Sequence, residues 1–84
     1  MKKNIIVTGG LGFIGSNLID LLIKKGFFVI NIDKVGYASN FYNTVNFKRK
    51  KNYKFFKLDI NNKNKILNIL NKYKPLGIFN LAAE

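Results

Sequence analysis

The chain alternates between short apolar runs and longer stretches in which apolar residues recur with helical spacing. Four short runs lack the regular apolar–polar alternation of a half-exposed strand, at residues 4–8, 27–32, 53–58 and 77–81. Such runs are typical of strands that are covered on both faces. Glycine, aspartate or proline lies close to an end of each run, so each predicted strand has a defined limit.

Two stretches between these runs predict helices. Residues 13–25 carry apolar side chains at i, i+4, i+7 and i+8, which predicts a single buried face made of Ile14, Leu18, Leu21 and Leu22. Lys24, Lys25 and then Gly26 suit the end of this helix.

The second helix is predicted to begin at a cap formed by Asn61 or Asn62 and to end before Pro75, which forbids its continuation. Its apolar side chains also share one face, made of Ile66, Ile69, Leu70 and Tyr73. Residues 34–52 have no clean period and predict a loop with one short helix.

The element order strand, helix, strand, loop, strand, helix, strand predicts an α/β fold with a parallel sheet covered on both faces. Right-handed crossovers place the strands in the order 3-2-1-4. This β-α-β-β-α-β arrangement is the N-terminal half of a Rossmann-type doubly wound sheet. We therefore expect residues 1–84 to form one partial domain of this fold.

Composition excludes several kinds of chemistry. The chain has no Cys, His or Trp, which excludes disulfides, thiolate catalysis, the usual zinc sites and every His-based triad. No apolar run reaches the roughly 18 residues of a membrane span, and none near Met1 matches a signal peptide. These features predict a cytoplasmic protein with no membrane partner.

The chain is strongly basic, with 15 Lys and Arg residues against 4 acids and a formal charge of +11. Taken alone, this charge suggests a nucleic-acid partner. The basic residues are scattered, however, apart from the run Lys48 to Lys51, and the abundance of Asn, Ile, Phe and Lys is typical of an A/T-rich genome. We therefore interpret the run as a solvated loop, with a phosphate-binding patch as the alternative.

A glycine-rich turn joins the first predicted strand to the first predicted helix. Gly9, Gly12 and Gly15 are spaced three apart, and Gly10 adds an overlapping G-x-G-x-x-G pattern. Residues without a Cβ let a pyrophosphate approach the backbone, and the N–H groups at the helix start can then bind the anion. A turn that serves only chain reversal is the alternative, and the missing Gly-Lys-Ser/Thr excludes a P-loop.

Two aspartates follow predicted strands, at the edge where open α/β sheets bind ligands. Asp33 lies 18 residues after Gly15 and is predicted to bind both hydroxyls of an adenosine ribose, which favours NAD over NADP although Lys34 is adjacent. Asp59 is predicted to bind the adenine amino group beside Ile60, with helix capping as its alternative role. The two acids share no third partner, so we expect no metal site.

The motif Thr8-Gly9-Gly10-Leu11-Gly12-Phe13-Ile14-Gly15 resembles the opening of extended short-chain dehydrogenase/reductases that act on nucleotide sugars. Asn31-Ile32-Asp33-Lys34, Tyr37-Ala38-x-Asn40, Tyr73-Lys74-Pro75 and the closing Asn80-Leu81-Ala82-Ala83-Glu84 resemble the dTDP-glucose 4,6-dehydratase family more narrowly. The resemblance implies an NAD-dependent lyase that converts dTDP-glucose to its 4-keto-6-deoxy product and water. UDP-sugar epimerases or decarboxylases of the same superfamily, and a non-enzymatic nucleotide-binding module, are the alternatives.

The resemblance also implies roles for particular residues. Phe13 and Ile14 would contact NAD through the glycine turn, and residues 33–36 would surround the adenosine ribose. The last four residues would line the nicotinamide side. The implied cofactor-binding set is Gly9, Gly12, Phe13, Ile14, Gly15, Asp33, Lys34, Val35, Gly36, Asp59, Ile60, Leu81, Ala82, Ala83 and Glu84.

In this family a Thr-Asp-Glu trio and a Tyr-x-x-x-Lys pair carry out catalysis further along the chain. The resemblance therefore implies that residues 1–84 form a partial NAD(P)-binding domain that stops before the catalytic and substrate-binding parts. We expect neither motif in these residues, so the chain alone is predicted to be inactive, with nucleotide sugar bound only by the full-length enzyme. A half-sheet leaves apolar side chains of the fourth strand and one strand edge uncovered, which predicts marginal stability or self-association.

Overall fold

The computed structural model describes residues 3–35 and 40–81 as a parallel sheet with a helix on each face. The strands are β1 (Asn4–Thr8), β2 (Phe28–Asp33), β3 (Tyr53–Lys57) and β4 (Gly77–Asn80). The helices are α1 (Phe13–Lys24) and α2 (Lys63–Tyr73), with a short 3₁₀ helix, η1 (Phe41–Thr44), in the loop before β3. Every predicted element is present, with limits that differ by one residue or less for the strands.

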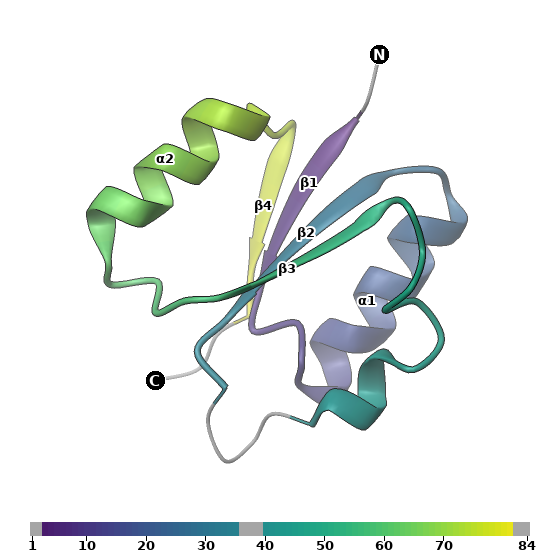
Figure 1. Cartoon of the computed structure of the whole chain (residues 1–84). Helices are drawn as coiled ribbons and strands as arrows, with labels where there is room; N and C mark the ends of the chain where they lie inside the picture. The colour runs from purple at the N-terminus through teal and green to yellow at the C-terminus, as the bar shows by residue number, and fades with distance from the viewer. Residues whose placement is uncertain (1–2, 36–39, 82–84) are drawn as a thin grey trace.

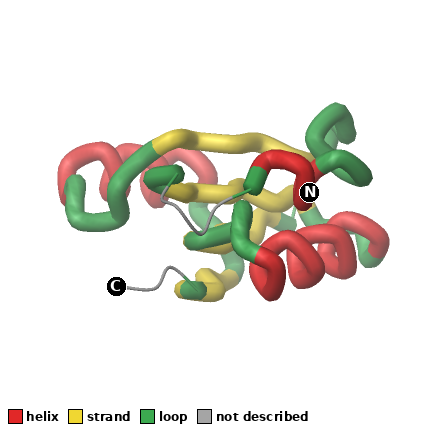
Figure 2. The backbone as a smooth tube through the Cα atoms, turned by 90° about the horizontal axis from the view of Figure 1, so that it is seen from below, coloured by secondary structure: helices red, strands yellow, loops and turns green. Residues whose placement is uncertain are grey.

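The sheet order is β3-β2-β1-β4, as the sequence predicted. All three strand pairs are parallel, so the carboxyl ends of the strands lie along one edge of the sheet. Figure 1 shows α1 and α2 on opposite sides of this sheet, and Figure 2 shows the same layers from below. This edge is where ligands bind in open α/β sheets.

Each face of the sheet has its own apolar core. On the α1 face, Ile5, Val7 and Val29 pack with the buried side of α1 and with Phe47. On the α2 face, Ile6, Ile30 and Ile32 pack with Ile69 and its neighbours. Because successive strand residues point to opposite faces, the unbroken apolar runs of β1 and β2 fill both cores.

The predicted buried face is confirmed in full for α2 and only in part for α1. In α2, the predicted residues Ile66, Ile69, Leu70 and Tyr73 all pack on the sheet, and the Asn62 side chain caps the helix by accepting the Lys65 N–H. In α1, the prediction is correct for Leu22, which is buried, and for Leu18, which packs against the core, but it is wrong for the other two residues. Ile14 and Leu21 are 73% and 51% exposed. The buried row is Gly15, Ser16, Ile19, Leu22 and Ile23.

The glycine turn explains why α1 buries a different row of residues from the one predicted. A Cβ on Gly15 would lie only 2.5 Å from the Gly9 carbonyl oxygen, so position 15 must face the turn and the sheet. Ile19, Leu22 and Ile23 follow at i+4, i+7 and i+8 from Gly15 and therefore face the sheet too. The third glycine of the motif, rather than the first apolar residue of the helix, determines the buried face.

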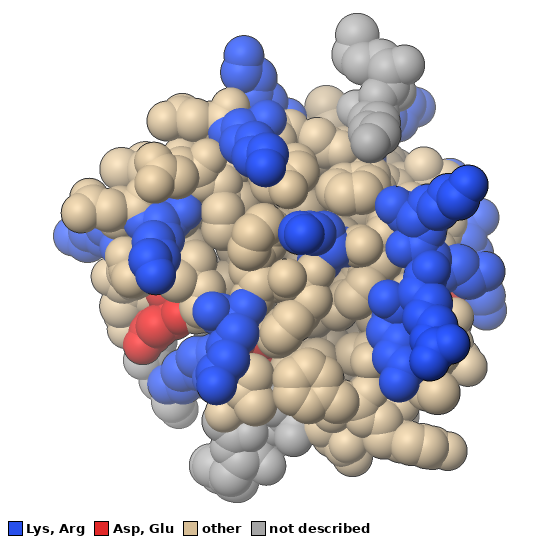
Figure 3. Space-filling view, viewed as in Figure 1, with Lys and Arg blue, Asp and Glu red and all other residues tan. Residues whose placement is uncertain are grey.

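The loop before β3 is anchored in the core. Phe47 is only 2% exposed, and its ring packs edge-on against Tyr53, with 4.8 Å between centroids. The adjacent basic run, Lys48 to Lys51, is exposed throughout, which is compatible with a solvated loop and with a phosphate-binding patch. Figure 3 shows Lys and Arg spread over this view of the molecule, with their largest group on the side of the loop before β3. No helix in the described part of the chain is long and apolar enough to cross a membrane.

Candidate functional site

The glycine turn lies at the carboxyl edge of the sheet and is fixed by its own backbone. The Gly9 N–H donates to the Ile32 carbonyl at 2.8 Å, which ties the turn to β2. The Gly12 N–H donates back to the Gly9 carbonyl at 3.2 Å and closes the turn. These two hydrogen bonds connect the turn to β2 and close it on itself.

The next two backbone N–H groups of the turn donate hydrogen bonds to side chains of β2. The Gly10 N–H donates to Asn31 Oδ1 at 2.9 Å, and the Leu11 N–H donates to Asp33 Oδ2 at 3.1 Å. The amides of residues 9–12 thus all have partners inside the protein. The donors left to face an anion are those of the first turn of α1, because a helix has no internal acceptors for its first N–H groups.

The start of α1 has the features of an anion site. Gly12 precedes the helix without a side-chain cap, and no acidic residue lies in the first turn. Phe13 and Ile14 form this turn, with side chains 75% and 73% exposed. The N–H groups and the positive end of the helix dipole are thus offered to a ligand at the surface.

Gly12 itself is not required by the fold. Its φ of −74° and ψ of 169° are accessible to any residue. A Cβ at this position would make only an ordinary contact, 3.5 Å from the Gly9 carbonyl oxygen. The space in front of Gly12 is therefore open to a group outside the chain, which fits the close approach of a pyrophosphate.

Asp33 ends β2 beside the turn, as predicted. The residue is buried, and in addition to the Leu11 N–H it accepts the Val35 N–H through Oδ1 at 2.7 Å. Lys34 is exposed, and Val35 has a φ of 65°, a conformation that β-branched residues rarely adopt. The acid is thus held in place by backbone donors from both sides.

The remaining predicted residues that the structure describes lie at the same edge. Asp59 is exposed, and its Oδ1 accepts the Asn61 N–H at 2.9 Å, while Asn62 and not Asp59 caps α2. The Ile60 side chain packs into the α2-side core. The Leu81 N–H donates to the Thr8 carbonyl at 3.0 Å, so Leu81 adjoins the start of the glycine turn. Gly36, Ala82, Ala83 and Glu84 lie outside the described residues, as do Tyr37 and Ala38 of the narrower motif.

Sequence reasoning missed Asn31, the buried amide that holds Gly10. A polar residue within an apolar strand needs a hydrogen-bond partner. This requirement was the feature of the sequence that could have indicated a structural role for Asn31. Asn31 Nδ2 donates to the Tyr53 phenol oxygen at 3.1 Å. Burial raises the pKa of Tyr53 above its ordinary value; the Asn31 hydrogen bond opposes this shift, and the charge of Asp33 adds to it.

The expectation that the chain contains no Tyr-x-x-x-Lys spacing is wrong, because Tyr53 and Lys57 have it. Both residues belong to β3, where positions four apart are about 13 Å apart along the strand. On a helix the same spacing places the two side chains side by side. Tyr53 is also hydrogen-bonded inside the protein, so the two residues do not form a catalytic pair.

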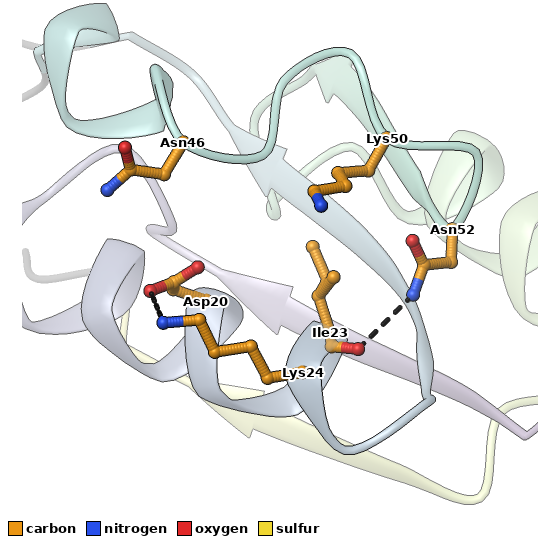
Figure 4. Close-up of a pocket in the computed structure, with 6 residues that line it drawn as sticks. All are labelled: Asp20, Ile23, Lys24, Asn46, Lys50 and Asn52. Atoms are coloured by element: carbon orange, nitrogen blue, oxygen red, sulfur yellow. Dashed lines mark hydrogen bonds and ion pairs between the residues drawn. The ribbon is translucent and has the colours of Figure 1, made fainter.

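A pocket of about 530 Å³ lies elsewhere, beside the C-terminal half of α1 and the loop before β3. Figure 4 shows its lining, in which Lys24 pairs with Asp20 at 3.2 Å and the Asn52 amide donates to the Ile23 carbonyl. This pocket is away from the carboxyl edge and contains none of the predicted cofactor residues.

Comparison with known proteins agrees with this geometry. A dTDP-glucose 4,6-dehydratase of Haemophilus influenzae is 49% identical over 82 residues, which are 96% of this chain and 24% of the relative. The crystal structure of dTDP-glucose 4,6-dehydratase from Bacillus anthracis in complex with NAD matches with a TM-score of 0.92 and 34% identity, over 98% of this chain and 27% of that one. The UDP-glucose 4-epimerase of Thermotoga maritima matches with a TM-score of 0.83 and 34% identity, over 96% of this chain and 24% of that one.

The chain thus spans about a quarter of the length of the relatives that it matches. The resemblance to dTDP-glucose 4,6-dehydratases and the Rossmann-type fold predicted from the sequence are both confirmed. The family model described as GDP-mannose 4,6 dehydratase matches residues 6–84, and the chain belongs to this family.

Proposed function

We propose that this chain is the NAD-binding part of a nucleotide-sugar 4,6-dehydratase whose substrate is dTDP-glucose. The observation that carries the proposal is the uncapped start of α1, which faces open space at Gly12 while Asp33 is fixed beside it. These residues fit NAD: the first turn of α1 binds the pyrophosphate and Asp33 the adenosine ribose. When bound, NAD supplies the acceptor and donor of hydride.

The rest of the predicted cofactor set has less specific roles in this proposal. Lys34, Val35 and Gly36 border the ribose, while Asp59 and Ile60 border the adenine. Leu81 and the three residues after it border the nicotinamide. Asp33 disfavours a 2′-phosphate through charge repulsion, so NAD is preferred over NADP.

The dehydration itself belongs to the full-length enzyme in this proposal, and the chain alone is inactive. A UDP-glucose 4-epimerase is the second candidate, because one matches over nearly the whole chain with a TM-score of 0.83. The greater TM-score and the sequence identity of the dTDP-glucose dehydratases favour the first candidate. The proposal also places the protein in the cytoplasm, where NAD and nucleotide sugars occur together.

The proposal is tested by titrating the chain with NAD and measuring heat or NMR shifts. Gly12→Ala is expected to weaken NAD binding about ten-fold, a loss of about 1.4 kcal/mol, because its methyl group occupies the space left for the pyrophosphate. Gly77→Ala is the matched control, since nothing lies within 4 Å of its new Cβ at the far end of β4. Equal affinities in the two variants, or no NAD binding by the wild-type chain, would refute the proposed site.

The salt dependence of binding distinguishes the proposed NAD site from a nucleic-acid-binding module. Binding through the basic run would weaken steeply as salt rises, because each phosphate contact releases counterions. NAD binding through two phosphates and neutral amides is expected to change only a few-fold between 50 and about 200 mM salt.

A further inference from the structure

Asn31 is a polar residue inside the sheet. It lies on β2 with no exposed surface, between the apolar residues Ile30 and Ile32. Its Oδ1 accepts the Gly10 N–H at 2.9 Å, and its Nδ2 donates to the Tyr53 phenol oxygen at 3.1 Å. A buried amide is tolerated only when such partners satisfy it, so the three groups form one unit.

The glycine turn rests directly on this amide. A Cβ at position 10 would overlap the Asn31 side chain and the Ile19 methyl group. Asn31 and Ile19 therefore lie directly beneath the turn and determine how closely it packs between β1 and α1. Gly10 is only three residues from Phe13. A shift of the Asn31 or Ile19 side chain therefore changes the direction in which the first N–H groups of α1 point.

Tyr53 determines the orientation of the Asn31 amide. Oδ1 can point at Gly10 only if Nδ2 points the other way, and the phenol oxygen is the acceptor in that direction. Tyr53 is itself fixed, because it pairs with Val29 in the sheet and its ring packs against Phe47. A fixed phenol thus holds the amide in the one orientation that serves Gly10.

From these contacts we infer that Asn31 is a positioning residue for the dinucleotide site and that Tyr53 acts through it. The inference rests on the proposed function, because NAD is the ligand whose affinity it concerns. It adds two residues that act on the site indirectly, by determining where the backbone N–H groups that would donate to the ligand lie.

Three variants test the inference. Asn31→Leu removes the acceptor of Gly10 at similar volume, and we expect NAD affinity to fall about ten-fold. Tyr53→Phe removes only the phenol oxygen, and a fall of about three-fold is expected. Tyr73→Phe is the control, because it removes a phenol from the opposite, α2 face and leaves the turn untouched.

The double variant, which combines Asn31→Leu with Tyr53→Phe, distinguishes a positioning role of Tyr53 from a general weakening of the fold. If Tyr53 acts through Asn31, the variant with both changes binds NAD as Asn31→Leu does, without a further loss. Affinities are measured well below each unfolding temperature. Lower unfolding temperatures with unchanged affinity, or losses that add independently, would overturn the inference.

The Gly10 amide gives a readout that needs no ligand. Its ¹H–¹⁵N resonance and its rate of hydrogen exchange are expected to change in Asn31→Leu and in Tyr53→Phe, and to stay unchanged in Tyr73→Phe. A Gly10 amide that is unaffected in the milder Tyr53→Phe variant overturns the inference. If the amide shifts and the wild-type chain does not bind NAD, the proposed function fails while the Asn31–Tyr53 link is upheld.

Discussion

The Leu11 N–H donates to Asp33 Oδ2 at 3.1 Å, so the acid that ends β2 is bonded to the turn that follows β1. The two residues are 22 positions apart in sequence. Their bond joins the expected ribose site to the expected pyrophosphate site. The two halves of a dinucleotide would therefore meet parts of the protein that move together.

This relationship predicts the effect of Asp33→Asn. The amide keeps one acceptor oxygen but loses the negative charge, so the preference for NAD over NADP is expected to fall about ten-fold. The measurement is the ratio of the two dissociation constants. Asp20→Asn on α1 is the control, and its ratio should match the wild type; a preserved ratio in Asp33→Asn would remove Asp33 from the ribose site.

The buried face of α1 predicts a contrast between two isoleucines. Ile19→Val removes a methylene from a fully buried position and is expected to lower the free energy of unfolding by about 1 kcal/mol. Ile14→Val makes the same change at a side chain that is 73% exposed, so its effect should stay within about 0.5 kcal/mol. Urea unfolding of both variants measures the difference, and equal effects would contradict the orientation of α1.

The end of α2 offers a stabilising change. Lys74 has a φ of 46°, a left-handed conformation in which glycine is favoured. Lys74→Gly is expected to raise the free energy of unfolding by about 0.5 to 1 kcal/mol, seen as a higher thermal midpoint. Lys72→Gly, inside the same helix, should lower it by about 1 kcal/mol instead. A loss of stability in both variants would show that Lys74 is not strained.

The burial of Tyr53 predicts a loss of stability at alkaline pH. Its folded-state pKa is raised, so the unfolded chain loses the phenol proton first as pH increases. The contribution of Tyr53 is thus fully present below the unfolded pKa of about 10 and is lost as pH rises through the folded pKa. Tyr53→Phe should show a smaller fall in stability above about pH 10 than the wild type.

The measurement combines chemical unfolding at several pH values with tyrosinate absorbance. The last part of the absorbance rise is expected to vanish in Tyr53→Phe and to persist in Tyr42→Phe, which removes a phenol that is 76% exposed. A late rise that persists in Tyr53→Phe would assign it to another tyrosine.

The uncovered side of β4 predicts self-association. Leu76, Ile78 and Phe79 are 69%, 52% and 43% exposed at the free edge of the sheet. Ile78→Lys is expected to shift the chain toward monomer in analytical ultracentrifugation, because a charged edge opposes strand pairing. Leu67→Lys, at a position that is 54% exposed on α2, is the matched control. A wild-type chain that is monomeric and unfolds cooperatively would contradict the prediction.

Much of the fold follows from local patterns. The apolar runs, Pro75 and the glycine turn specify strands, helices and breaks within a few residues, since each depends on near neighbours. Asp33 and Asp59 could be placed at one edge because parallel strands end on the same side. Asn31 could not be assigned a role in this way, because its partners Gly10 and Tyr53 are 21 and 22 positions away.

The sequence by itself determined the order of the elements, the sheet topology and the position of the glycine turn, because these depend on spacing and on connections that can cross in only one hand. Only the tertiary structure decided which side of α1 is buried. The helix has more apolar residues than one face requires, and the contact of Gly15 with the turn selects Ile19 over Ile14. It also decided that Phe47 and Asn31 are core residues, because burial depends on what packs against a side chain from elsewhere in the chain.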